Sequence, residues 1–169
     1  LRTGFDLNTR EGQRRAWKII TTQEPEVVYM APKCTAWNSM FCSTAPEWKQ
    51  IQNQRKDLPM VHFCIQVAMY QIKKGRRFII ENPQTARMWT KVPGMVKLSS
   101  CEGVTWDTLN MCAYGMKDPA SNLYYLKAVT LLHNLSVTAA AILLLLPQPL
   151  LLSLLGCLLQ RCPSRGRAA

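Results

Sequence analysis

The stretch "VVYMAPKCTAW", residues 27–37, carries the feature that decides the fold. Four apolar residues, three of them strong strand formers, run directly into Ala-Pro. Such a run is typical of a short strand buried in a parallel sheet. "RRFIIENP", residues 76–83, repeats the arrangement downstream. We therefore expect one buried strand that is closed by Pro32 and a second that ends near Glu81.

Helical patterns surround these two strands. Residues 8–26, "NTREGQRRAWKIITTQEPE", read as a short helix stopped by Pro25, and residues 46–74 read as helical with an interruption around Leu58-Pro59. Gly75 is placed to end that second helix. Its expected core face recurs at helical spacing and comprises Val61, Cys64, Ile65, Ala68, Met69 and Ile72.

Two further strands are expected nearer the C-terminus. "VTWDTLNMCAYG", residues 104–115, alternates polar and apolar side chains, and "LKAVTLLHN", residues 126–134, is a short apolar run. Helices that alternate with strands predict an α/β fold with a parallel sheet over residues 1–135. Ligands of such sheets bind beyond the carboxyl ends of the strands. The ends to examine are therefore residues 32–34 and 81–83.

The charge and the cysteines restrict the class of protein. The chain has 169 residues and a net charge of +11, and residues 1–135 hold 18 basic and 10 acidic groups. This excess favours a polyanionic partner such as nucleic acid, although a generally basic surface explains it equally well. The seven cysteines include no Cys-x-x-Cys pair, and the two histidines lack ligand-like spacing, so no metal site is predicted. Reduced thiols and no recognisable signal peptide favour an intracellular protein, and a nuclear location is compatible with this.

The composition changes after Asn134, and residues 136–169 are expected to form a separate tail. Residues 139–159, "AAAILLLLPQPLLLSLLGCLL", are almost wholly apolar and about as long as a bilayer span. Pro147 and Pro149 divide the segment into two short halves. Two alternatives remain open: a membrane or hairpin segment, and an abnormal tail produced by a frameshift or by read-through of non-coding sequence.

Cys34, Glu81 and Asn82 are the candidate chemical groups. A cysteine at a strand end can be displayed as a reactive thiolate, although free cysteines are more often simply buried. Glu81 directly follows "RFII" and could act as an acid or base, or it could be an ordinary solvated carboxylate. Asn82 and Pro83 are expected in the rigid turn after the strand. The combination of a cysteine after one strand and Glu-Asn after the next is more specific than either residue alone.

At these residues the chain resembles the cytosine-C5 DNA methyltransferase family. That family has a Pro-Cys nucleophile loop, matched here by "APKCTAW" with Cys34, and a Glu-Asn motif at the next strand end, matched by "IIENP". "GFDL", residues 4–7, looks like the family's Gly-Asp-hydrophobic element, and "LNMCAYG" is similar to its later strand that ends in Tyr-Gly. The resemblance covers about residues 4–135. The overall sequence pattern is also similar to methyltransferase-like segments of retroelement polyproteins.

The resemblance implies a Rossmann-like methyltransferase sheet and a mechanism. The Cys34 thiolate would add to C6 of a flipped-out cytosine, Glu81 would hydrogen-bond or protonate N3, and C5 would attack the methyl group of S-adenosylmethionine. Asp6 would lie near the adenine of this cofactor and Pro32 beside it. DNA or another nucleic acid would be the partner.

The chain departs from the family pattern in several ways. The glycine-rich cofactor loop and the acidic residue that binds the ribose are not found, Glu-Asn-Pro replaces Glu-Asn-Val, and Lys33 replaces a proline before the cysteine. "MKDPASNLYYLKA", residues 116–128, lacks the Gln-x-Arg-x-Arg element, and no target-recognition domain is visible. We therefore expect an N-terminally incomplete sheet, poor binding of S-adenosylmethionine, and a domain that is a fragment and could be inactive.

One basic cluster is a candidate for nucleic-acid contact. "KKGRR", residues 73–77, supplies Lys73, Lys74, Arg76 and Arg77, which could contact phosphates or could merely favour the C-terminus of a helix. Three hypotheses follow: a methyltransferase-like domain, a non-enzymatic nucleic-acid-associated remnant of a retrotransposon polyprotein, and a protein associated with a membrane through its leucine-rich tail.

Overall fold

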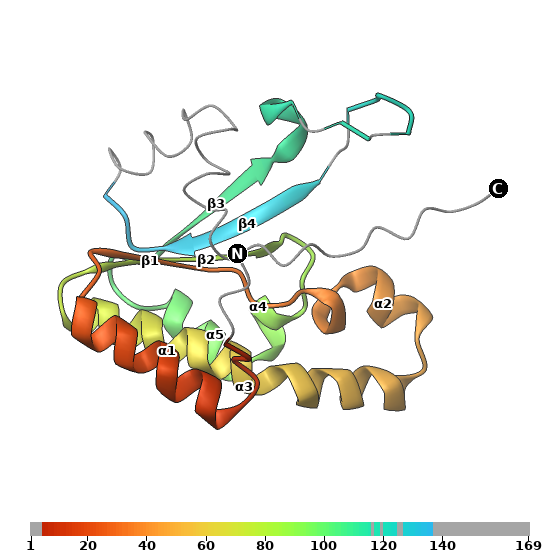
Figure 1. Cartoon of the computed structure of the whole chain (residues 1–169). Helices are drawn as coiled ribbons and strands as arrows, with labels where there is room; N and C mark the ends of the chain where they lie inside the picture. Colours follow the sequence, from red (N-terminus) through yellow and green to blue (C-terminus); the bar gives the residue numbers. More distant parts are fainter. Residues whose placement is uncertain (1–4, 116, 119, 125–126, 137–169) are drawn as a thin grey trace.

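Four strands form one sheet in the order β1-β2-β4-β3, and helices cover one of its faces (Figure 1). The computed structural model of the chain describes residues 5–115, 117, 118, 120–124 and 127–136, so the predicted tail lies outside them beyond Ser136. The strands are β1 (Val27–Met30), β2 (Arg77–Pro83), β3 (Thr105–Asn110) and β4 (Ala128–His133).

The sheet is mixed rather than parallel. β1 and β2 run parallel, with Val27 opposite Arg77 and Met30 opposite Ile80, whereas β4 runs antiparallel to both β2 and β3. The α/β prediction is confirmed, and the prediction of a wholly parallel sheet is wrong. A parallel neighbour needs a long crossover, usually a helix. The long helix α3 supplies one between β1 and β2, whereas the described residues between β3 and β4 include only the short helix η2.

Two long helices account for most of the helical layer. α1 (Arg10–Gln23) begins where the Thr9 hydroxyl accepts the Gly12 N–H at 3.1 Å, and it ends at Glu24, whose φ is +46°. α3 (Glu47–Lys73) ends just before Gly75, whose φ of +68° confirms the predicted helix end. The shorter helices are η1 (Thr35–Trp37), α2 (Ser39–Thr44), α4 (Met88–Lys91), α5 (Pro93–Ser99) and η2 (Met111–Tyr114).

The predicted interruption near Leu58-Pro59 is wrong, because α3 passes through Pro59 without a break. A proline inside a helix costs about 3 kcal/mol and deprives the carbonyl four residues earlier, here that of Arg55, of its usual donor. The second half of α3 offsets this cost by burying Val61, Val67 and Ala68 completely. Gln13 also donates from Nε2 to the Pro59 carbonyl at 3.1 Å, which ties α1 to α3 at this point.

The main core lies between the sheet and the helices. Phe78 and Ile80 of β2 pack there with Leu132 of β4, and all three are fully buried. β1 is an edge strand, so the expectation of a fully buried strand is wrong: Val27 is 45% exposed and only Met30 is buried. Met69, which was expected in the core, is 40% exposed.

The other face of the sheet carries a second, smaller cluster. Because side chains alternate along a strand, Ile79 and Glu81 point away from the helices, as does Leu131, the residue opposite Glu81 on β4. β2 also continues past its predicted end at Glu81, and both Asn82 and Pro83 pair with β4. This extension decides where the Glu-Asn pair points.

Candidate functional site

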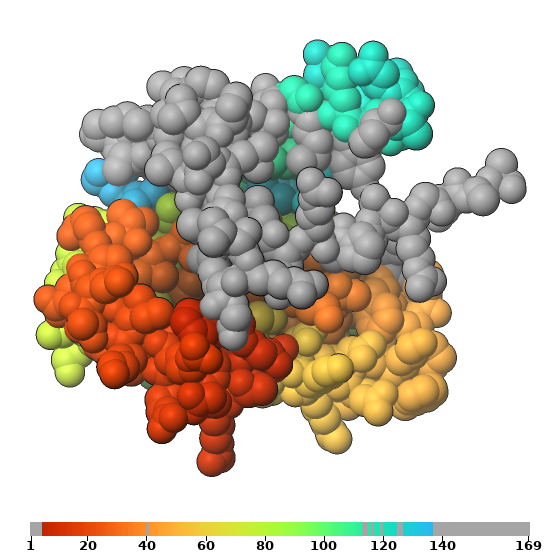
Figure 2. All heavy atoms as spheres, in the orientation of Figure 1, coloured from red at the N-terminus to blue at the C-terminus, as the bar shows by residue number. Residues whose placement is uncertain are grey.

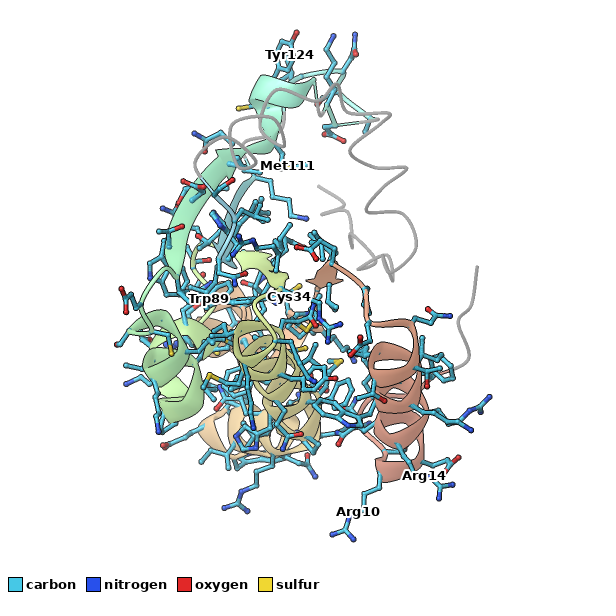
Figure 3. The ribbon with its side chains drawn as sticks, turned by 90° about the vertical axis from the view of Figure 1, so that its left-hand side faces the viewer. Arg10, Arg14, Cys34, Trp89, Met111 and Tyr124 are labelled. Atoms are coloured by element: carbon cyan, nitrogen blue, oxygen red, sulfur yellow. The ribbon has the colours of Figure 1, made fainter. Side chains whose placement is uncertain are left out.

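Cys34 lies in the loop that follows β1, at the carboxyl end of the strand. Its side chain is half-buried, and its backbone carbonyl accepts the Trp37 N–H at 3.0 Å, which opens the short helix η1. Trp37 is 3% exposed and anchors the loop in the main core. Figure 3 shows Cys34 where the sheet meets the helical layer. The loop is therefore a packed segment that holds the thiol in a defined place.

Asn82 connects this loop to the neighbouring strand. Its Nδ2 donates to the Pro32 carbonyl at 2.7 Å, and the side chain is 1% exposed. The prediction that Asn82 lies in a turn is wrong, because it sits inside β2 opposite Thr130. That position points its amide toward the helical side, where Pro32 lies. A second bond joins the two strand ends, from the Arg87 N–H to the Trp37 carbonyl at 2.8 Å.

Glu81 points to the opposite face of the sheet from Asn82. The Tyr29 hydroxyl donates to its Oε2 across a long distance of 3.5 Å. Burial raises the pKa of Glu81, while the nearby charge of Lys127 and the bond from Tyr29 act in the lowering direction. Burial, together with the Glu81 charge, raises the pKa of the Tyr29 hydroxyl in turn. Glu81 is thus a carboxyl that holds its proton more tightly than an exposed glutamate does.

Two buried polar atoms near the Cys34 loop have no hydrogen-bond partner within the described part of the chain. They are the indole Nε1 of Trp37, a donor, and the Oδ1 of Asn82, an acceptor. Unpaired buried polar atoms are uncommon in folded proteins and cost free energy. Sequence reasoning could not identify them, because their burial follows from the extension of β2 and from the packing of η1.

Cations surround the same ends of β1 and β2. Lys33 follows β1, Arg87 follows β2, and Lys127 directly precedes β4 beside the end of β2; all three are exposed. The charges of Lys33 and Lys56 both influence the pKa of Asp57, a residue that is 4% exposed. Burial raises the pKa of Asp57, and the two lysines act in the lowering direction. The positions of Lys33, Arg87 and Lys127 beside strand ends are the sequence signal that indicates them.

The predicted basic cluster, residues 73–77, lies at the other end of β2. Lys73 and Lys74 are exposed, whereas Arg76 is only 9% exposed. Its Nη1 lies 3.4 Å from the Glu24 carboxylate and its guanidinium lies over the Tyr70 ring, 5.5 Å from the centroid. β2 has seven residues, so about 20 Å separates its two ends. The structure does not bring this cluster to Cys34.

Asp6 and Pro32 both make local hydrogen bonds, and both lie outside the cavities of the helical layer. The Asp6 carboxylate accepts the Asn8 N–H at 3.0 Å, and its backbone carbonyl accepts the Thr9 N–H at 3.0 Å. The turn is packed so closely on α1 that a Cβ at Gly12 would lie 2.0 Å from the Asp6 oxygen. Pro32 is buried, and its carbonyl is taken by Asn82. Neither residue lines the two cavities on the helical layer.

The tryptophans and methionines divide between packing and exposure. Trp37 and Trp89 are buried, Trp106 contacts Trp89 edge-on at 5.0 Å, and Trp48 is 67% exposed. Met30 and Met95 are buried.

Among the described residues, no three or more His, Cys, Asp or Glu side chains gather in a group that could hold a metal ion. Within the same residues, no helix combines the length and hydrophobicity that a bilayer span needs. The predicted membrane segment, residues 139–159, lies outside them.

No protein-family model, no curated protein and no solved structure matches the chain.

Proposed function

We propose that this chain contains the base-handling part of a cytosine-C5 DNA methyltransferase-like domain, with Cys34 as nucleophile and Glu81 as acid. The observation that carries the proposal is the hydrogen bond from Asn82 to the Pro32 carbonyl, 2.7 Å long and buried. It holds the cysteine loop of one strand against the end of the next, parallel strand, and α3 forms the crossover between them. Asn82 is a positioning residue in this scheme.

The proposed chemistry begins at the end of β1. The Cys34 thiolate adds to C6 of an extruded cytosine, and the C5–C6 π electrons move through the ring toward N3, which takes a proton from Glu81. C5 then becomes nucleophilic. The raised pKa of Glu81 supports this role, because a general acid must still hold its proton near the working pH. Since Glu81 and Asn82 point to opposite faces, the base would enter between the cysteine loop and the Tyr29–Glu81 pair.

S-adenosylmethionine would supply the methyl group in the family and remains a prediction of the resemblance. The first test avoids the cofactor. If Cys34 adds to C6, C5 takes a deuteron from D₂O, the original C5 proton leaves, and the thiolate is then expelled, so that C5–H is replaced by C5–D. The exchange is measured by NMR on single-stranded DNA with the full chain.

We expect exchange with the wild-type chain and at least a tenfold slower rate with Cys34→Ser. Cys101→Ser is the matched control, because Cys101 is also half-buried but lies at the end of α5. Exchange no faster than in buffer, or equal in wild type and Cys34→Ser, would reject a nucleophilic Cys34.

A second candidate is a non-catalytic nucleic-acid-binding remnant of a retrotransposon polyprotein. The exposed cations Lys33, Lys56, Arg87 and Lys127 around one edge of the sheet favour it. It predicts binding of single-stranded DNA that weakens steeply with salt and survives Cys34→Ser unchanged. Counterion release is visible over about 50 to 300 mM salt. Absent binding, or equal binding at the two ends of this range, would reject the non-catalytic candidate.

A further inference from the structure

A groove between α1 and α3 is separate from the Cys34 site. Two adjoining cavities of about 430 and 650 Å³ share Arg10, Gln13, Phe63 and Gln66 in their linings. Figure 2 shows α1 and α3 side by side on the lower surface of the molecule, and the α3 residues that line the groove run from Arg55 to Met69. The bond from Gln13 to the Pro59 carbonyl fixes the separation of the helices at one end of the groove.

The floor of the groove is apolar and its rim is basic. Phe63, Trp17 and Met69 contribute to the floor, and Met69 is 40% exposed although it sits on a helix that packs against the core. Arg10 and Arg55 line the rim and are exposed. No carboxylate lines either cavity, and neither arginine forms an ion pair with another residue of the described segments.

Arg14 adds a third rim cation, and its charge is shared. It lies in a 2.6 Å ion pair with Glu11, in which both side chains are mostly exposed. Such an exposed pair contributes little and can be exchanged for a partner's carboxylate at little cost. In Figure 3, Arg10 and Arg14 extend from α1 away from the body of the molecule. The uncompensated charge of the groove is therefore positive.

The aromatic rings do not offer a stacking platform. Trp17 packs on Phe63 with 6.2 Å between centroids and on Tyr70 with 5.1 Å. Single-stranded nucleic acids are held by open aromatic faces as well as by cations. Apolar side chains of a peptide fit this floor better than bases do.

We propose that the α1–α3 groove docks an acidic amphipathic helix of a partner protein. The α3 residues that line the groove run from Arg55 to Met69, a length of about 21 Å, so the groove offers space for about three to four turns of a partner helix. Apolar side chains at positions i, i+3 or i+4, and i+7 of that helix would enter the apolar floor, and its flanking glutamates would meet Arg10 and Arg55. The proposal does not depend on the methyltransferase-like function.

The test uses the full chain and a synthetic 14-residue peptide with leucines at helical spacing and glutamates elsewhere. We expect saturable binding by fluorescence anisotropy, and at least a tenfold weaker affinity with Arg10→Glu/Arg55→Glu. Lys18→Glu/Lys97→Glu is the matched control, because both lysines are exposed and neither lines the groove. Met69→Gln should weaken binding several-fold without a charge change. Circular dichroism confirms that each variant is folded.

A second peptide with the same composition but with the leucines dispersed separates docking from general charge attraction, and it should bind at least tenfold more weakly. The proposal is overturned if the two peptides bind alike, if both charge-reversed pairs lose affinity equally, or if no binding saturates. It is also overturned if 12-residue oligothymidylate displaces the acidic peptide and loses affinity with the same arginine pair, since the groove would then bind nucleic acid. Cys34→Ser should leave peptide binding unchanged, which keeps this test separate from that of the proposed function.

Discussion

Each end of the parallel pair β1–β2 is held by a buried side-chain amide, but the two amides hold different parts of the chain. At the starting end, the buried amide of Gln71 donates to the carbonyls of Pro25 and Arg77, both at 2.9 Å. At the carboxyl end, the buried amide of Asn82 donates to the Pro32 carbonyl at 2.7 Å. Gln71 joins α3 to the start of both strands, and Asn82 fixes the loop that carries Cys34. A buried amide by itself therefore does not indicate function.

The surroundings distinguish the two ends. At the starting end, Arg76 is paired with Glu24, and Asn134 uses both ends of its amide, accepting the Phe78 N–H at 2.8 Å and donating to the Arg76 carbonyl at 2.9 Å. At the carboxyl end, Glu81 is a half-buried carboxyl whose pKa is raised by burial, and exposed cations lie around it. We infer that the starting end is mainly structural and that the carboxyl end is the place to look for chemistry.

The largest expected effect is at the structural end. Gln71→Ala should lower the free energy of unfolding by about 3 kcal/mol, because it removes two buried hydrogen bonds and leaves a cavity. Urea unfolding measures the change. Gln52→Ala, an exposed position on the same helix, should change stability by less than about 0.5 kcal/mol. A loss below about 1 kcal/mol for Gln71→Ala would show that the bonds to Pro25 and Arg77 do not hold this end.

Asn82→Ala should cost less, about 2 kcal/mol, because a single short hydrogen bond is lost. Its second effect is local: the Cys34 loop is released, and alkylation of Cys34 by iodoacetamide should accelerate at least fivefold. Tandem mass spectrometry measures this rate in native protein. Cys101 is the half-buried reference, and Cys64 should stay unreactive because burial raises the pKa of its thiol to about 12. An unchanged Cys34 rate would mean that Asn82 does not position the loop.

Local sequence patterns predicted the helices and strands, whereas strand pairing and strand direction depend on contacts between residues that are far apart in the sequence. The α1 helix, the end of α3 at Gly75 and the existence of all four strands could be predicted, because each depends on nearby residues. The direction of β4 could not, since it is set by pairing with β2, which lies far earlier in the chain. The passage of α3 through Pro59 was also missed, because burial elsewhere on the helix outweighs the local penalty.

The site was predicted in part for the same reason. Position at strand ends identified Cys34, Glu81 and Asn82. The opposite directions of Glu81 and Asn82 could not be foreseen, because they result from two extra paired residues at the end of β2. The cluster at residues 73–77 stood out because it is contiguous, whereas the cations around Cys34 come from separate segments that only the fold brings to one edge.

The pH dependence of stability is a smaller effect that tests the carboxyl end. Because the folded-state pKa of Glu81 is raised, its protonated form is favoured by folding, and stability is lost as pH rises from about the ordinary value of 4.5 through the raised pKa. Glu81→Gln removes this loss and can keep the contact with Tyr29. Each unit of raised pKa corresponds to about 1.4 kcal/mol at higher pH. Urea unfolding at pH 4 and pH 8 should show the variant more stable than wild type only at pH 8. Equal stability at both values would place Glu81 in a hydrated setting.

The smallest expected effect compares the charges at the two ends directly. Lys33→Ala/Lys127→Ala removes two exposed cations at the carboxyl end, and Lys73→Ala/Lys74→Ala removes two exposed cations at the starting end. If nucleic acid binds at the carboxyl end, the first pair should weaken binding of oligothymidylate several-fold. It should also reduce the slope of log affinity against log salt by about 1.4, since each phosphate contact on a single strand contributes about 0.7. The second pair should change neither quantity, because β2 separates its lysines from the site by about 20 Å. Fluorescence anisotropy between 50 and 300 mM salt spans about the range in which counterion release is measurable. A larger loss of affinity from Lys73→Ala/Lys74→Ala would indicate that nucleic acid contacts residues 73–77. The charges would then give no reason to treat the two ends differently.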